Sequence, residues 1–115
     1  MSESTEAVRD IAEVAAVEVI TTAAVHLMSA AAVKVGLAPD TDDAKGAELM
    51  DLDEARKLIT ALAALVTGAA PDLGNQHARS LRDGLRSLQL AFREASPFPD
   101  APGDGPGEKY TGSVV

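Results

Sequence analysis

The chain of 115 residues contains no cysteine and no tryptophan, one tyrosine and two phenylalanines. The absence of cysteine excludes a disulfide framework, thiolate metal sites and cysteine nucleophiles. The scarcity of aromatic residues disfavours an all-β domain, whose strands are rich in aromatic and β-branched side chains. Apolar residues still make up 46% of the chain, and alanine, the best helix former, is prominent among them. The composition therefore predicts one small all-α domain.

Positive charge is also scarce, because 10 lysines and arginines stand against 18 aspartates and glutamates, for a net charge of −8. Such a chain has no overall attraction to nucleic acid or anionic lipid. The first residues are acidic, whereas a secretory signal begins with basic residues and an uninterrupted apolar run. Residues 19–33 lack formal charge, but a membrane span needs about 20 predominantly apolar residues. We expect a cytoplasmic protein with no integral membrane span.

Helix caps and helix-ending residues divide the chain into three helices. A cap at Ser4 or Thr5 starts the first helix, and Gly36 ends it with a left-handed turn. Asp51 caps the second helix, which we expect to end at Gly68. The predicted bounds are about 5–35, 52–67 and 76–95 for the helices, with an acidic loop over 38–50.

The last 20 residues, 96–115, hold four prolines and four glycines. This composition predicts a disordered tail after a three-helix domain that spans residues 1–95. The tail reads as a solubilising extension, with a recognition peptide captured in a partner's groove as the alternative.

The first helix is apolar on every side, and a helix of this kind has to be covered on every side. The second and third helices are too short to wrap a first helix of about 45 Å completely. A second copy of the chain is the simplest cover, so we expect a homodimer or higher oligomer. The alternative is a monomer whose extra apolar surface is mostly alanine. The residues predicted to mediate self-association are Val17, Ile20, Leu27 and Met28.

Four arginines lie within an arc of about 60° on the third helix, about 120° from its leucine-rich side. We call Arg79, Arg82, Arg86 and Arg93 the arginine stripe. One interpretation is a docking surface for RNA or for an acidic protein. The favoured interpretation is that these arginines pair with carboxylates inside the bundle or across a dimer. The candidate carboxylates are Glu13, Glu18, Asp53 and Glu54.

The sequence contains no recognisable catalytic, cofactor or metal motif. It lacks a nucleophile elbow and a phosphate-binding glycine loop. The segment from Asp40 to Asp51 has the length of a calcium loop, but Ala44 stands where a ligand is required. His26 and His77 lie on different helices without a second ligand at helical spacing. We expect no enzymatic activity, no metal and no cofactor.

The sequence resembles a bacterial family, the domain of unknown function 1844, from about Ile11 to Glu94. The resemblance implies a helical cytosolic protein without an assigned activity, so no catalytic residue is carried over. Thr60 departs from the family pattern, in which aspartate is common. The matching residues are His26, Leu27, Gly36, Pro39, Leu52, Ala55, Arg56, Ile59, Asn75, Leu85 and Leu88.

The composition, rich in alanine and with more arginine than lysine, looks like an actinobacterial version of this family. The resemblance implies genes that tend to lie beside translation genes, including that for initiation factor three. Because the first helix is apolar on every side and no catalytic motif is present, our leading hypothesis is a non-enzymatic protein-interaction and self-association module. The alternative is a translation-associated factor that binds ribosomal RNA or a ribosomal protein through the arginine stripe.

Overall fold

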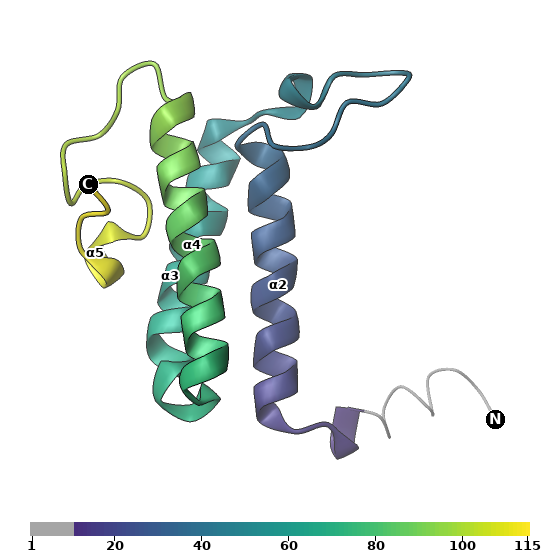
Figure 1. Cartoon of the computed structure of the whole chain (residues 1–115), viewed down its shortest axis with the longest axis vertical. Coiled ribbons are helices and arrows are strands. Elements are labelled where there is room, and N and C mark those ends of the chain that lie inside the picture. The colour runs from purple at the N-terminus through teal and green to yellow at the C-terminus, as the bar shows by residue number, and fades with distance from the viewer. Residues whose placement is uncertain (1–10) are drawn as a thin grey trace.

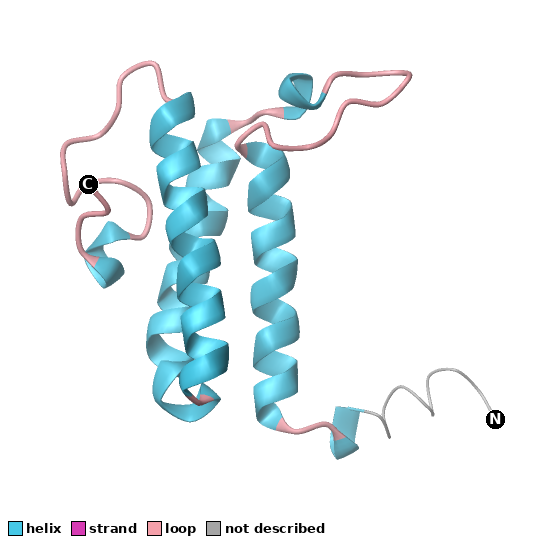
Figure 2. Ribbon diagram, in the orientation of Figure 1, coloured by secondary structure: helices cyan, strands magenta, loops and turns pink. Residues whose placement is uncertain are grey.

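A computed structural model of the chain describes residues 11–115, and in that range every regular element is a helix. Three long helices, α2 (Ala16–Lys34), α3 (Leu52–Leu73) and α4 (Asn75–Ala95), pack side by side as a bundle (Figures 1 and 2). Two short helices accompany them, the 3₁₀ helix η1 (Gly46–Leu49) and α5 (Glu108–Thr111). The predicted all-α fold with three main helices is confirmed.

The first long helix is shorter than predicted at its N-terminal end. Residues 11–13 form a separate helical turn, and the chain is extended at Ala15, where φ is −65° and ψ is 146°. Residues 5–10 of the predicted helix lie outside the described range. The C-terminal end agrees with the prediction: Gly36 has a φ of 91°, and its N–H donates to the Val33 carbonyl while Leu37 N–H donates to that of Ala32. This pair of bonds is the Schellman ending expected from a glycine at this position.

The second long helix continues beyond the predicted end at residue 67. It passes through Gly68 and Pro71 and ends only at Leu73, so the predicted boundary is wrong. Leu73 is buried, and Ala69 packs against the core, so burial of apolar side chains favours the additional turn. Gly68 lowers helix propensity by about 1 kcal/mol relative to alanine but does not itself end a helix.

The core lies between the three long helices, and α2 contributes mainly small side chains to it. Ala24 and Ala31 of α2 are fully buried, which brings this helix close to its neighbours. Larger side chains from α3 and from the leucine-rich side of α4 fill the remaining space. The buried cluster comprises Ala24, Ala31, Val35, Ala55, Ile59, Leu62, Ala63, Val66, Leu73, Leu81, Leu85, Leu88 and Phe92.

The acidic connection between α2 and α3 is a loop, as predicted, with η1 near its end. The Asp40 carboxylate accepts a hydrogen bond of 2.7 Å from the N–H of Gly46. The N–H of Asp51 donates to the Lys34 carbonyl, which ties the end of the loop to the end of α2. One acidic side chain therefore folds the loop on itself.

Residues 96–115, which we call the C-terminal segment, are not a disordered tail. They fold back along α3 and α4, on the side of the bundle away from α2 (Figure 1). Pro106, Gly107, Glu108 and Val114 are buried. Side chains of α4 donate hydrogen bonds to its carbonyl groups, and Arg56 of α3 donates to its Asp100 carboxylate, so the segment acquires partners that its own composition does not provide. The predicted disorder is wrong for this reason.

Candidate interaction surfaces

One side of α2 has no acidic, lysine or arginine side chain and is uncovered. Its residues recur at alternating intervals of three and four, and all of them are exposed. The side chains of Val19 and Val33 are 50% and 36% exposed. This spacing is that of the contact seam between two packed helices. We call this set, Val19, Thr22, His26, Ser29 and Val33, the outer face of α2.

Additional apolar side chains extend the outer face of α2 at both ends. Ile11 and Val14 lie exposed before the helix, and a hollow of about 590 Å³ on this side is lined by both of them together with Val19 and His26. Met50 lies against Gly36 at the other end and is 45% exposed. Exposed apolar side chains therefore lie beyond both ends of α2.

The helix α2 is also the one described helix long and apolar enough to cross a membrane. The most apolar 18 residues within Ala16–Lys34 have a mean hydropathy of 1.6, and 11% of them are buried. In the fold, however, α2 is one wall of the bundle and packs its alanines against α3 and α4. Its length and composition alone are weak evidence for a membrane span, because a core helix meets the same criteria.

The four residues predicted to mediate self-association lie on the opposite side of α2. Val17, Ile20, Leu27 and Met28 are partly buried and pack against the core of their own chain. A helix that is apolar on every side contains no signal for which side faces inward. The chain therefore uses the predicted residues for its own bundle and leaves the outer face of α2 uncovered.

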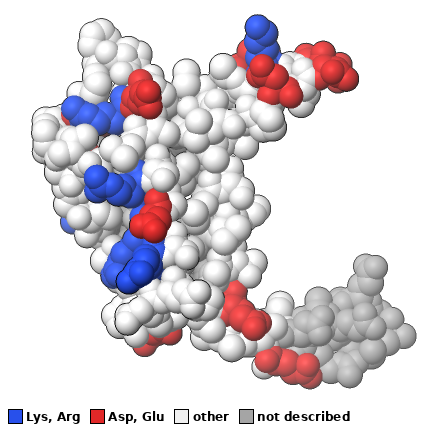
Figure 3. All heavy atoms as spheres, in the orientation of Figure 1, with Lys and Arg blue, Asp and Glu red and all other residues white. Residues whose placement is uncertain are grey.

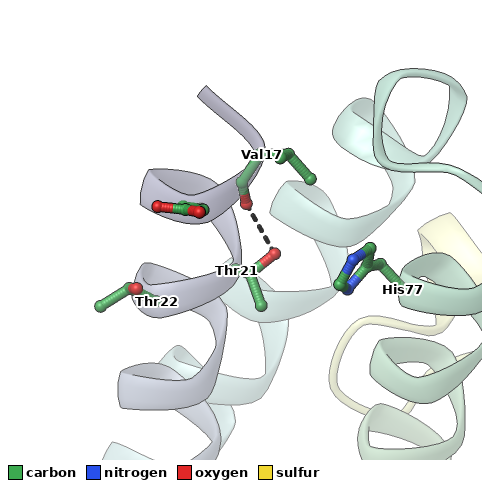
Figure 4. A pocket seen from close by; sticks show the side chains of 5 residues that line it. Val17, Thr21, Thr22 and His77 are labelled. Carbon is green, nitrogen blue, oxygen red and sulfur yellow. Dashed lines mark hydrogen bonds between the residues drawn. The ribbon is translucent and has the colours of Figure 1, made fainter. Parts of the chain in front are cut away.

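A second hollow, of about 390 Å³, opens between the start of α2 and the start of α4. His77 points across it toward Thr21, whereas Thr22 points away (Figure 4). The hydroxyl of Thr21 donates to the Val17 carbonyl at 2.6 Å. This hydroxyl is bound to the backbone and not to the imidazole, so the two side chains do not form a nucleophile and base pair.

The two histidines occupy exposed positions. His26 lies on the outer face of α2. His77 is a surface residue in the first turn of α4. Across residues 11–115, no group of three or more potential ligands is placed to hold a metal ion.

The arginine stripe follows α4, where basic side chains alternate with acidic ones over an otherwise uncharged surface (Figure 3). Arg86 donates to the Val114 carbonyl at 3.2 Å, and Arg93 donates to the Asp100 carbonyl at 2.8 Å. Arg79 and Arg82 are exposed. Half of the stripe therefore binds the chain's own C-terminal segment.

The carboxylates predicted to pair with the arginine stripe do not do so within one chain. The ion pairs within residues 11–115 join Arg56 to Asp100 at 2.9 Å and Lys57 to Glu54 at 3.5 Å. Arg86 and Arg93 donate instead to carbonyl oxygens of the C-terminal segment. This segment lies beside α4, although the sequence predicted that it is disordered. Pairing across a dimer stays a prediction.

Comparison with known families agrees with the resemblance seen in the sequence. The family described as Domain of unknown function (DUF1844) matches residues 16–94. The chain belongs to this family. No curated protein and no solved structure matches the chain. The DUF1844 match covers α2, α3 and nearly all of α4, and the C-terminal segment lies outside it.

Two residues of the DUF1844 region have roles that the sequence did not reveal. Gln89 is 3% exposed, and its amide donates to the Pro106 carbonyl at 3.0 Å and to the Thr111 hydroxyl at 3.1 Å. Arg56 lies over the ring of Phe92, 4.9 Å from its centroid, while it binds Asp100. The sequence signal for the role of Gln89 was its position close to the leucine-rich side of the third helix. This position does not indicate which part of the chain Gln89 contacts.

Proposed function

We propose that this DUF1844 protein is a non-enzymatic, cytoplasmic interaction module that self-associates through the outer face of α2. The observation that carries the proposal is a row of five exposed side chains with seam spacing and no acidic or basic residue other than His26. In a chain of net charge −8, this row adds little repulsion between two copies, and Glu18 borders it at the start of α2. A symmetric dimer brings the same surface of both copies together.

The chemistry of the outer face of α2 fits another helix. Thr22 and Ser29 are small, so two helix backbones can approach closely between the valines that flank them. Nineteen residues of α2 span about 28 Å, which is about five turns of contact. Helices that pack in this way bring their seams together along their whole length.

The energetics favour a dimer of modest affinity. A valine that is half exposed in the free chain contributes about 1 kcal/mol when it is fully buried. Val19 and Val33 of two copies provide four such contributions, and Met50 and Val14 add to them. Association itself costs at least about 4 kcal/mol. The contributions exceed this cost by no more than about 4 kcal/mol, so we expect an affinity near 1 mM, and the assay has to cover concentrations up to about 1 mM.

The experiment measures the mass of the full chain by sedimentation equilibrium between about 10 μM and 1 mM. The test variant is Val19→Glu with Val33→Glu, which places two charges on the outer face of α2. The matched control is Ala61→Glu with Ser80→Glu, which adds the same charge at exposed positions of α3 and α4. Far-UV circular dichroism verifies that each variant keeps its helix content.

We expect dimers for the wild type and the control and monomers for the test variant. A wild type that stays monomeric at the highest concentration contradicts the proposal. Membrane attachment through the same surface is a separate outcome: the wild type, but not the test variant, would then sediment with anionic vesicles. RNA binding through the arginine stripe would instead be insensitive to both α2 substitutions.

A further inference from the structure

The C-terminal segment is held by a row of donors on one side of the bundle. Arg86, Gln89 and Arg93 are spaced three and four residues apart along α4, so their side chains lie on one side of the helix. They donate hydrogen bonds to carbonyl oxygens of Val114, Pro106 and Asp100. These donors bind three backbone oxygens of a segment that contains turns and the short helix α5, so they fix its folded path along α4.

Three positions of the segment supply specificity in addition to the backbone bonds. The Asp100 carboxylate binds Arg56 of α3 at 2.9 Å. Gly107, with a φ of 76°, lies so close to α3 that a Cβ there would be 2.6 Å from the Cβ of Ala63. Val114 is 6% exposed and lies in the hollow that Val66 also lines. The groove therefore recognises an acidic residue, then a glycine, then a small aliphatic residue.

The groove and its occupant are separate parts of the chain. The four donors, Arg56, Arg86, Gln89 and Arg93, lie within the DUF1844 match at 16–94, and every acceptor lies after it. The connection between them is the short stretch from Ser96 to Pro99. Phe98 in this connection is 92% exposed, so its side chain does not pack against the bundle.

We propose that the groove between α3 and α4 is a peptide-docking site, and that the C-terminal segment of a second copy can replace the chain's own segment in it. A second copy carries the same acidic residue, glycine and valine in the same order, so it satisfies every donor. Exchange of an identical segment creates no new contact at the groove and is limited only by the connection. This exchange is independent of the outer face of α2.

The experiment uses the full chain and a synthetic peptide of residues 96–115 that carries a dye at its N-terminus. In a released variant, Asp100→Ala with Gly107→Ala, the chain's own segment is weakened, and both changes lie outside the helical core. A second released variant, Asp100→Ala with Val114→Asp, gives an independent measure. Fluorescence anisotropy reports peptide binding, and circular dichroism verifies the helix content.

We expect the peptide to bind both released variants at least about tenfold more tightly than the wild type, because a tethered segment competes at millimolar effective concentration. A peptide with Gly107→Ala should not bind, whereas Lys109→Ala should bind normally, since Lys109 is exposed and contacts the adjacent Tyr110 ring. Equal binding of the Gly107→Ala peptide, or no binding to either folded variant, overturns the proposal. The Val19→Glu, Val33→Glu variant should bind the peptide as the wild type does, which separates this result from self-association through α2.

Discussion

Met28 of α2 fills the space that Gly84 leaves open on α4. A Cβ at position 84 would overlap the terminal methyl group of Met28. Gly84 lies in the middle of a helix, where glycine costs about 1 kcal/mol relative to alanine. This close approach of α2 and α4 accounts for a glycine that helix propensity alone disfavours.

Replacement of Gly84 should depend on the size of the new side chain. We expect Gly84→Ala to change the free energy of unfolding by less than about 1 kcal/mol, because the gain in helix propensity offsets a small displacement of Met28. Gly84→Leu should destabilise by about 1–3 kcal/mol, as overpacking separates α2 from α4. Urea unfolding measures both. If Gly84→Leu is as stable as the wild type, Met28 does not fix the distance between the helices.

The start of α3 depends on a side-chain cap. The Asp51 carboxylate accepts a hydrogen bond of 3.2 Å from the N–H of Glu54. Asp51→Ala should therefore destabilise the protein by about 1 kcal/mol, whereas Asp51→Asn should keep most of the stability because its amide oxygen also caps. The urea midpoints of the two variants test this difference. If both variants have the urea midpoint of the wild type, the cap contributes nothing measurable to stability.

The Arg56–Asp100 ion pair fastens the start of the C-terminal segment. The two side chains are 44% and 29% exposed, so solvent screening limits the pair to about 1 kcal/mol or less. Arg56→Ala should raise amide hydrogen exchange in residues 100–114 by up to about fivefold and leave core amides of α3 unchanged. Arg56→Lys should retain part of the effect, because it keeps the charge but loses the planar contact with Phe92. Faster exchange throughout the bundle would show instead that Arg56 supports the whole fold.

Local signals in the sequence predicted the features that depend on neighbouring residues. Gly36 ends α2 and Asp51 caps α3 because both effects involve groups within a few residues along the chain. The predicted leucine-rich side of α4 also faces the core, since the polar residues of this helix fix which side is buried. No comparable contrast exists on α2, so its inward side was not predictable from periodicity.

The features that the sequence did not predict depend on residues distant in the chain. The C-terminal segment is ordered by contacts such as that of Arg86 with Val114, which lie 28 positions apart. Its prolines and glycines predict a disordered segment when the segment is considered alone. The prediction fails here because a neighbouring helix supplies hydrogen-bond donors to the segment. The extension of α3 past Gly68 likewise follows from burial of Leu73 against the bundle.

The salt dependence of RNA binding tests how much of the arginine stripe is free. The slope of log K against log salt for single strands is about −0.7 per phosphate contact, so two free arginines give about −1.4 and four give about −2.8. Because Arg86 and Arg93 hold the C-terminal segment, any binding of a labelled single-stranded RNA should show the shallower slope. Arg79→Ala with Arg82→Ala should remove this binding, whereas Lys57→Ala, which lies on α3, should not. A slope near −2.8 for the wild type would mean that RNA displaces the segment from α4, and it would favour the translation-associated alternative.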